Sequence, residues 1–206
     1  MKTEQQINEY ANLRGEISQR MTRNNNLITF TITTTVAILS FAIKENLTIL
    51  FLLPFCIIIP MSMRIAYSRS SLSKISSYMI VFLEEDLDGM QWETRNILLF
   101  ENKRKEKHKH KFIDKCTSFI SKITILRYYD CLILSISCYF LYVYDYLKDK
   151  EISANIFIPI LIPLPLVLWE ILIAKRMNTM EKEKLHWIDT WNTIKKQELE
   201  KNIIKH

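Results

Sequence analysis

The chain has 206 residues, of which 49% are hydrophobic and 24% charged, and its formal net charge is +6 at pH 7. It contains two glycines, which excludes a Walker loop, a GxGxxG fingerprint and a nucleophile elbow, since each needs glycine where backbone approaches phosphate or turns sharply. No spacing of Ser, His and Asp suggests a catalytic arrangement either, so we predict that the protein is not an enzyme and uses no cofactor.

Residues 1–26 are predicted to form a short amphipathic helix. Ile7, Tyr10, Ile17 and Met21 recur at helical spacing with polar residues between them. The three asparagines at 24–26 predict a break before the next element.

Four uncharged stretches predict membrane spans. They are residues 27–43, 47–63 and 152–169, together with residues 131–144 extended by their rims at 127–130 and 145–147. A hydrocarbon core needs about 20 helical residues, with about 17 to 25 tolerated. A soluble bundle is the alternative, but its surface helices would carry a polar stripe that residues 47–60 lack.

The positive charges predict an orientation. Of the 28 Lys and Arg residues, 4 precede the first span, 13 lie between Arg64 and Arg127, and 8 follow Ala174. By the positive-inside rule both termini and the middle segment lie in the cytoplasm. We therefore predict an all-α, four-helix integral membrane protein. The two transmembrane hairpins are residues 27–65 and 123–176. The three cytoplasmic helical segments are residues 1–26, 66–122, which holds the basic run, and 177–206.

The first span carries a cluster of threonines. Hydroxyls in a membrane helix bond back to their own helix, bond to a neighbouring helix, or line an uncharged pore. Pore lining and helix packing both stay open. The candidate pore-lining residues are Thr31, Thr34 and Thr35.

Glu170 is the one acid deep within an apolar run of the fourth span. Ionisable groups in membrane helices mark pathways or pairings. Arg127 and Asp130 are predicted at comparable depth on the adjoining helix. Glu170 therefore forms a structural ion pair with Arg127, acts as a gate or ion-path carboxylate, or snorkels to the membrane interface. Prolines should kink the outer half of the same span because neighbouring helices can cover the freed carbonyls. They are Pro159, Pro163 and Pro165.

An amphipathic helix is predicted after the second span, ending at the turn Asp88-Gly89. The acids at 84–88 resemble a cation-binding cluster, but we expect them to be the solvated end of that helix. Trp187 and Trp191, four residues apart on a predicted C-terminal helix, are expected to pack between helices rather than to stack on nucleic-acid bases.

Residues 101–115 hold seven Lys or Arg, two His and three acids. This basic run is the candidate ligand-binding segment, with lipid headgroups and solvent as alternative contacts. His108 and His110 are two residues apart and point in different directions on a helix, so no metal site is predicted. The candidate ligand-binding residues are Lys103, Arg104, Lys105, Lys107, His108, Lys109 and Lys111.

The segment Ile75 to Arg95, "ISSYMIVFLEEDLDGMQWETR", resembles small bacterial multi-span membrane effectors of anti-phage defence systems of the retron, cyclic-oligonucleotide and Hailong types. The resemblance implies a homo-oligomer in the bacterial inner membrane, with four copies as a working number. It also implies a pore gated by an anionic nucleotide or oligonucleotide. The alternative is a membrane-anchored scaffold that binds nucleic acid or a protein partner without forming a pore.

Overall fold

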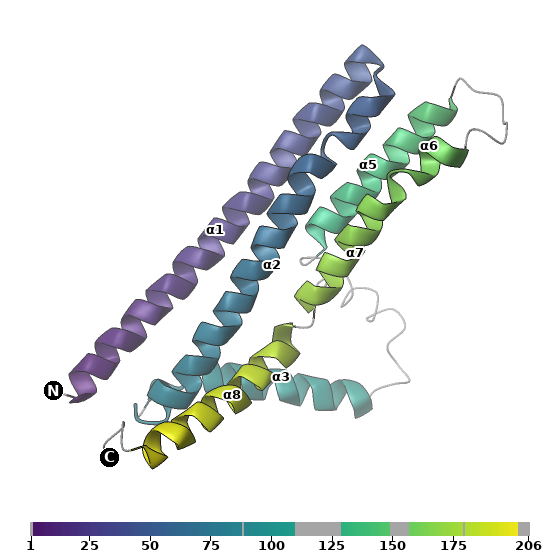
Figure 1. The fold of residues 1–206 in the computed structure, drawn as a ribbon. Coiled ribbons are helices and arrows are strands. Elements are labelled where there is room, and N and C mark those ends of the chain that lie inside the picture. Colours follow the sequence, from purple (N-terminus) through teal and green to yellow (C-terminus); the bar gives the residue numbers. More distant parts are fainter. Residues whose placement is uncertain (1, 88, 110–128, 149–156, 179, 202–206) are drawn as a thin grey trace. The chain divides into compact units, whose positions relative to one another are not determined.

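The computed structural model describes residues 2–87, 89–109, 129–148, 157–178 and 180–201, and they are helical apart from short turns (Figure 1). The all-α prediction is confirmed. The elements include a 3-10 helix, η1, and a π-helical segment, η2. In chain order they are α1 (Lys2–Glu45), η1 (Thr48–Leu52), α2 (Phe55–Tyr78), η2 (Met79–Glu84), α3 (Trp92–Lys109), α5 (Asp130–Leu147), α6 (Phe157–Leu161), α7 (Leu164–Asn178) and α8 (Met180–Glu200).

The chain divides into two compact units. Unit 1 contains residues 1–21, 69–122 and 179–206, and unit 2 contains residues 22–68 and 123–178. Helices α1 and α2 each supply residues to both units. Unit 2 holds most of the uncharged stretches, whereas unit 1 holds most of the charged segments.

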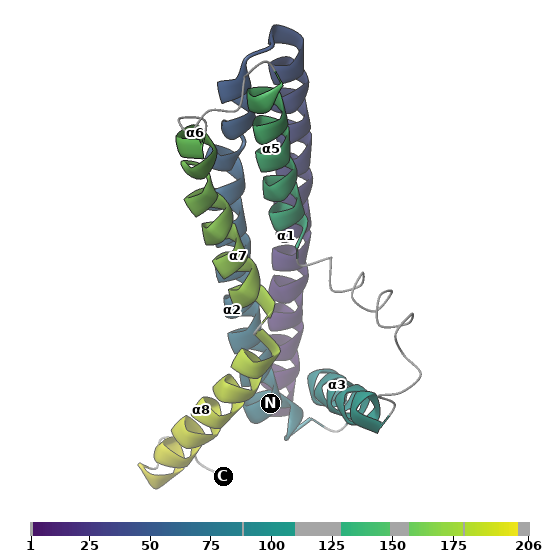
Figure 2. The same ribbon diagram turned by 90° about the vertical axis from the view of Figure 1, so that its right-hand side faces the viewer.

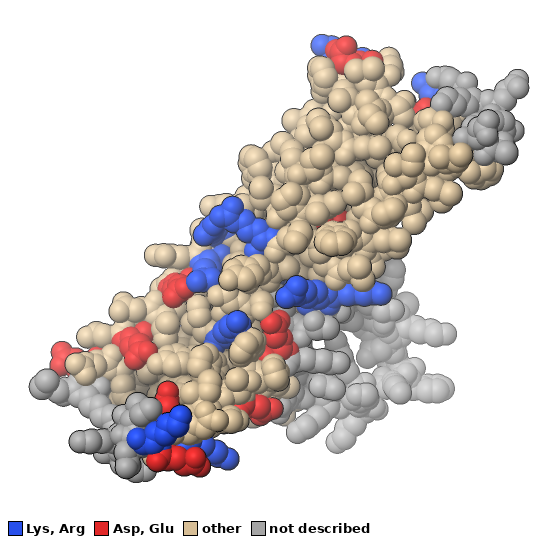
Figure 3. Space-filling view, in the orientation of Figure 1, with Lys and Arg blue, Asp and Glu red and all other residues tan. Residues whose placement is uncertain are grey.

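Four helical segments are long and apolar enough to cross a membrane, which confirms that this is a membrane protein by length and composition. They are Glu4–Glu45, Thr48–Glu84, Asp130–Leu147 and Phe157–Met177. Large apolar side chains of unit 2 face outward, with Phe30 52%, Phe140 66% and Leu172 61% exposed. Residues other than Lys, Arg, Asp and Glu cover most of the visible surface of unit 2 (Figure 3). Lipid contact accounts for an apolar surface of this kind.

The interior of unit 2 joins the two hairpins. Phe55 and Ile58 of α2 belong to one core cluster with Cys138 of α5 and Ile173 of α7. Leu39 of α1 packs against the same cluster. Helices α5 and α7 lie side by side in both ribbon views (Figures 1 and 2). A hydrogen bond also ties the hairpins together at one end, where Thr48 Oγ1 donates to Asp145 Oδ2 at 2.7 Å.

The prolines interrupt the fourth span, as predicted, and divide it into α6 and α7. Pro163 has no N–H to donate to the carbonyl of Pro159 four residues earlier. The neighbouring helix α5 covers that carbonyl, because the hydroxyl of Tyr142 donates to Pro159 O at 3.1 Å. Tyr139 similarly donates to Ile160 O at 3.2 Å. Two tyrosines thus replace backbone donors in an apolar setting.

The predicted break at residues 24–26 is wrong, because α1 continues through all three asparagines to Glu45. Asparagine lowers helix stability by less than about 0.7 kcal/mol per residue relative to alanine, which packing elsewhere on a long helix overrides. Asn24 is itself buried, at 5% exposed.

Unit 1 has its own apolar core. Met79 and Leu83 of η2 and the following Leu87 are buried, and Tyr10 and Ile17 of α1 pack against them. The apolar face predicted for residues 1–26 therefore packs against η2 and Leu87.

Helix α8 docks in unit 1 through its tryptophans. The ring of Trp191 meets Tyr78 and Phe82 edge-on at centroid distances of 5.6 and 6.1 Å. Its Nε1 donates to the carbonyl of Lys74 at 3.3 Å, and Lys74 Nζ lies 4.3 Å from the centroid of the Trp187 ring. The tryptophans pack between helices, as predicted.

Candidate functional site

Each span of unit 2 turns at least one polar side chain into the interior. These residues form the interior polar set, which consists of Thr31 and Thr35 of α1, Ser62 of α2, Ser135 of α5 and Glu170 of α7. Every member is at most 1% exposed. The set thus places hydroxyls and one carboxyl where an apolar core would ordinarily be continuous.

Helical spacing explains why the set faces inward. Ser135 lies four residues after Cys131 and three before Cys138, and both cysteines belong to the core cluster of unit 2. Positions i, i+4 and i+7 share one face of a helix. Ser135 therefore occupies the stripe of α5 that packs against the other spans.

A hydrogen bond within the set connects the hairpins. The hydroxyl of Ser62 lies 2.7 Å from Oε1 of Glu170. The same hydroxyl lies 2.9 Å from the carbonyl of Ile59 on its own helix. A serine hydroxyl has one proton to donate. Ser62 can therefore exchange its bond to Glu170 for one within α2 without leaving its rotamer.

Three atoms of the interior polar set have no hydrogen-bond partner among the described residues. They are Thr35 Oγ1, Ser135 Oγ and Glu170 Oε2. Burying a hydroxyl without a partner costs about 1 to 3 kcal/mol by protein mutational data, and a carboxylate costs more. Orphaned buried groups are uncommon in native proteins, so three within the interior polar set, beside Asn24 Oδ1 elsewhere in unit 2, call for an explanation.

The predicted pore-lining threonines separate into different environments. Thr31 and Thr35 are buried, Thr34 is half-buried, and Thr33 on another face is exposed. Thr31 Oγ1 donates to the carbonyl of Leu27 at 2.7 Å, which satisfies its proton within α1. Of the three candidates, Thr35 is therefore the one whose hydroxyl is buried without a partner in the described part of the chain.

The predicted gate residues are only partly described. Asp130 is the first residue of α5 and is half-buried, whereas Arg127 lies outside the described residues. The partner that the structure gives Glu170 is Ser62, which sequence reasoning missed. One feature of the sequence pointed to Ser62, because it is the one serine in the uncharged stretch 47–63.

The basic run begins within α3. Six of its candidate ligand-binding residues, Lys103, Arg104, Lys105, Lys107, His108 and Lys109, lie on this helix, whereas Lys111 lies outside the described residues. The basic run therefore lies in the C-terminal half of α3. The N-terminus of α3 makes separate contacts within unit 1.

Glu84 makes those contacts, and the prediction that its side chain is solvated is wrong. It is 1% exposed. Its Oε1 accepts from the backbone N–H of Glu93 at 2.8 Å and from the Tyr10 hydroxyl at 3.3 Å. Its Oε2 accepts from the N–H of Thr94 at 2.8 Å and from Thr94 Oγ1 at 2.7 Å. A carboxylate at these first-turn N–H groups caps α3 and opposes the positive end of its dipole.

The backbone explains how Glu84 reaches that position. Helix α2 passes directly into the π-helical segment η2, of which Glu84 is the last residue. A π turn widens the helix and is frequent at functional sites. The chain then reverses at Gly89, whose φ of +86° favours glycine, and α3 begins three residues later.

Glu93 is the second buried carboxylate of unit 1, at 6% exposed. Its Oε1 pairs with Arg14 NH1 of α1 at 3.0 Å. Its Oε2 accepts from Ser76 Oγ of α2 at 2.6 Å and from Lys184 Nζ of α8 at 2.8 Å. Burial alone would raise the pKa of Glu93, but Lys184, Ser76 and Arg14 together hold it below its ordinary value.

Glu84 and Glu93 both lie within the segment, Ile75 to Arg95, that carries the resemblance to anti-phage membrane effectors. No protein-family model, curated protein or solved structure matches the chain. The resemblance stays a prediction. The structure gives the segment a physical role, because its two buried carboxylates join α1, α2, α3 and α8 within unit 1.

Proposed function

We propose that this protein is a homo-oligomeric pore of the bacterial inner membrane, closed in the described arrangement and opened by an anionic cytoplasmic ligand. The interior polar set of unit 2 carries the proposal, above all the unpartnered Thr35 Oγ1, Ser135 Oγ and Glu170 Oε2. Polar groups at membrane depth are costly and are found where water or ions pass. On opening, these atoms gain water as their partner.

The charge distribution supports the orientation that this function requires. The 25 Lys and Arg residues outside Lys44, Lys148 and Lys150 fall on one side of the predicted spans. By the positive-inside rule, unit 1 then lies in the cytoplasm, where a nucleotide signal would reach it.

The contact between Ser62 and Glu170 acts as the gate in this proposal. It joins α2 of the first hairpin to α7 of the second. When the Ser62 hydroxyl turns to the Ile59 carbonyl, Glu170 loses its hydrogen bond to Ser62, and hydration of the carboxyl becomes favourable. Separation of the hairpins and entry of water are thereby linked.

Anti-phage defence is the biological setting that the resemblance of Ile75 to Arg95 suggests. In such a setting the pore stays closed during growth and opens when infection changes a nucleotide or oligonucleotide signal. The basic residues of α3 supply countercharge for an anionic ligand.

Potassium flux from liposomes containing the purified protein tests the proposal. We expect low flux for the wild type and at least tenfold higher flux for Ser62→Ala, which removes the gate bond. Ser40→Ala is the matched control, because Ser40 is an exposed serine of the first span that donates to its own Val36 carbonyl. Equal flux for both variants and the wild type would contradict the gate, and no conductance in any variant would contradict the pore.

A further inference from the structure

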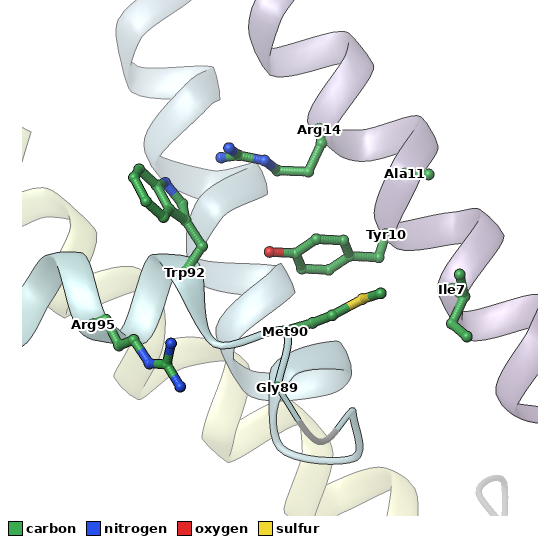
Figure 4. A pocket seen from close by; sticks show the side chains of 8 residues that line it. All are labelled: Ile7, Tyr10, Ala11, Arg14, Gly89, Met90, Trp92 and Arg95. Atoms are coloured by element: carbon green, nitrogen blue, oxygen red, sulfur yellow. The ribbon is translucent and has the colours of Figure 1, made fainter.

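Unit 1 contains a pocket of about 520 Å³ that the interior polar set does not involve. This volume falls within the range of about 300 to 1,000 Å³ typical of small-molecule sites. Residues from α1 and from the turn and first residues of α3 line it. They are Ile7, Tyr10, Ala11, Arg14, Gly89, Met90, Trp92 and Arg95 (Figure 4).

The charged lining residues are both arginines. Arg14 pairs with Glu93 through NH1. Arg95 is exposed, and the structure gives its guanidinium no ion pair among the described residues. No Asp or Glu lines the pocket. Guanidinium groups bind phosphate and carboxylate with a planar fork of N–H donors, so the pocket favours an anion with several oxygens.

The rest of the pocket lining is uncharged and includes aromatic and apolar side chains. Trp92 is 59% and Met90 39% exposed, although both are large apolar side chains. The guanidinium carbon of Arg14 lies 5.7 Å from the centroid of the Trp92 ring. Figure 4 shows Tyr10 and Arg14 reaching from α1 toward Met90 and Trp92. An exposed indole beside arginines suits a flat aromatic ring, because the π-face of a nucleotide base stacks on an aromatic side chain.

We infer that this pocket binds a nucleotide, with its base against Trp92 and Met90 and its phosphates against Arg95 and Arg14. One ligand class combines a flat ring with adjacent phosphate oxygens, and the pocket offers both complements within a single cavity. The inference places ligand recognition at Arg14 and Arg95, apart from the basic run. It rests on the proposed function only for what binding does to the pore.

Arg14 connects this pocket to the rest of unit 1. It has five N–H donors, of which NH1 contacts Glu93. Phosphate in the pocket competes with Glu93 for the guanidinium. Glu93 also binds Ser76 of α2 and Lys184 of α8. Nucleotide binding therefore changes the balance of contacts that joins α1 to α2 and α8.

Binding of ATP to the full-length protein in detergent micelles, measured by isothermal titration calorimetry, tests the inference without any flux. Adenosine tests the binding of the base without phosphates, and tripolyphosphate tests the binding of the phosphates without a base. We expect saturable ATP binding, with adenosine and tripolyphosphate each at least tenfold weaker. Trp92→Ala and Arg95→Gln should each weaken ATP by about tenfold or more, since the lost stacking or charged hydrogen bond is worth about 1.5 kcal/mol or more.

Lys196→Gln is the matched control, because it removes one exposed positive charge of α8 that does not line the pocket. It should bind ATP like the wild type. Absence of saturable ATP binding, or unchanged binding in Trp92→Ala and Arg95→Gln, would overturn the inference. Equal binding of ATP and tripolyphosphate would also overturn it, because the ring would then contribute nothing. These results are independent of liposome flux, so the pocket and the pore can fail separately.

Discussion

Glu84 and Glu93 of unit 1 and Glu170 of unit 2 are all buried carboxyl side chains, at 1%, 6% and 1% exposed. Their surroundings differ. Glu84 accepts hydrogen bonds from Tyr10, Thr94 and the backbone of α3, and Glu93 accepts from two cations and a serine. Glu170 accepts from Ser62 alone, and its Oε2 has no partner among the described residues.

The difference separates carboxylates that hold helices together, Glu84 and Glu93, from Glu170, for which we propose a role in gating. A fully bonded carboxylate holds elements in one arrangement, because removing any partner leaves the others buried and unpaired. A carboxyl with a vacant oxygen instead favours any rearrangement that brings it water. Unit 1 therefore uses its buried carboxylates to hold its helices together, whereas we propose that Glu170 of unit 2 acts in gating.

The largest effect is expected for Glu93→Ala. It leaves Arg14 and the largely buried Lys184 without their carboxylate, and breaking a buried pair in this way costs about 3 to 5 kcal/mol. Faster amide hydrogen exchange in α8 and a lower denaturation midpoint would report the loss. The control is Glu85→Ala, whose exposed pair with Lys195 is worth at most about 1 kcal/mol. Equal effects of the two variants would contradict the structural role of Glu93 in holding α8.

Thr35→Val is expected to raise stability and lower function together. It replaces a buried hydroxyl that has no partner by an apolar group of similar shape, which should stabilise unit 2 by about 1 to 3 kcal/mol. If Thr35 lines the open path, the same change lowers potassium flux in the Ser62→Ala background. Thr33→Val, at an exposed threonine that donates to Thr29 O, should change neither quantity.

Lower flux without a gain in stability would show that the Thr35 hydroxyl has a hydrogen-bond partner in the closed protein. A gain in stability with unchanged flux would remove Thr35 from the path.

Acid should loosen unit 1 through Glu93. Its pKa in the folded protein lies below the ordinary value of 4.5, so the charged form is favoured by folding. The stabilisation is fully present above pH 4.5 and is lost as the pH falls toward the lower folded pKa. Hydrogen exchange in α8 should therefore accelerate below pH 4.5. Glu93→Gln should flatten this part of the profile, and an unaltered profile in that variant would contradict the assignment.

Trp191→Phe is expected to have the smallest effect. It keeps an aromatic ring against Tyr78 and Phe82 but removes the Nε1 donor, whose 3.3 Å bond to Lys74 O is long. A net loss of about 0.5 to 1.5 kcal/mol follows. A loss in α8 protection as large as that of Glu93→Ala would show that the Trp191 hydrogen bond holds α8 as strongly as the carboxylate does, and would contradict this ranking.

Much of the fold follows from sequence because membrane spans leave a strong local signal. The four uncharged stretches, the break at Pro163 and the shared helix face of Trp187 and Trp191 all depend on residues close together in the chain. The partners of Glu170 and Glu93 do not. Ser62 is 108 residues from Glu170, and Lys184 is 91 from Glu93.

The burial of Glu84 was hidden for a related reason. "EED" at 84–86 reads as a solvated helix end, but one of its three acids turns inward to cap a helix that begins after the turn. Which acid does so depends on the π-helical segment η2, and composition gives no sign of a π turn. The error at residues 24–26 had the opposite cause. The three asparagines disfavour helix locally, but the long helix α1 continues through them.

The central claim is that Glu170 lines the open path, and the reversal potential of single channels tests it most directly. Ser62→Ala channels in planar bilayers under a KCl gradient should prefer potassium over chloride, because a carboxylate in a narrow path attracts cations. Ser62→Ala with Glu170→Gln keeps the shape and removes the charge, so the potassium preference should fall. An unchanged reversal potential in the double variant would contradict the claim.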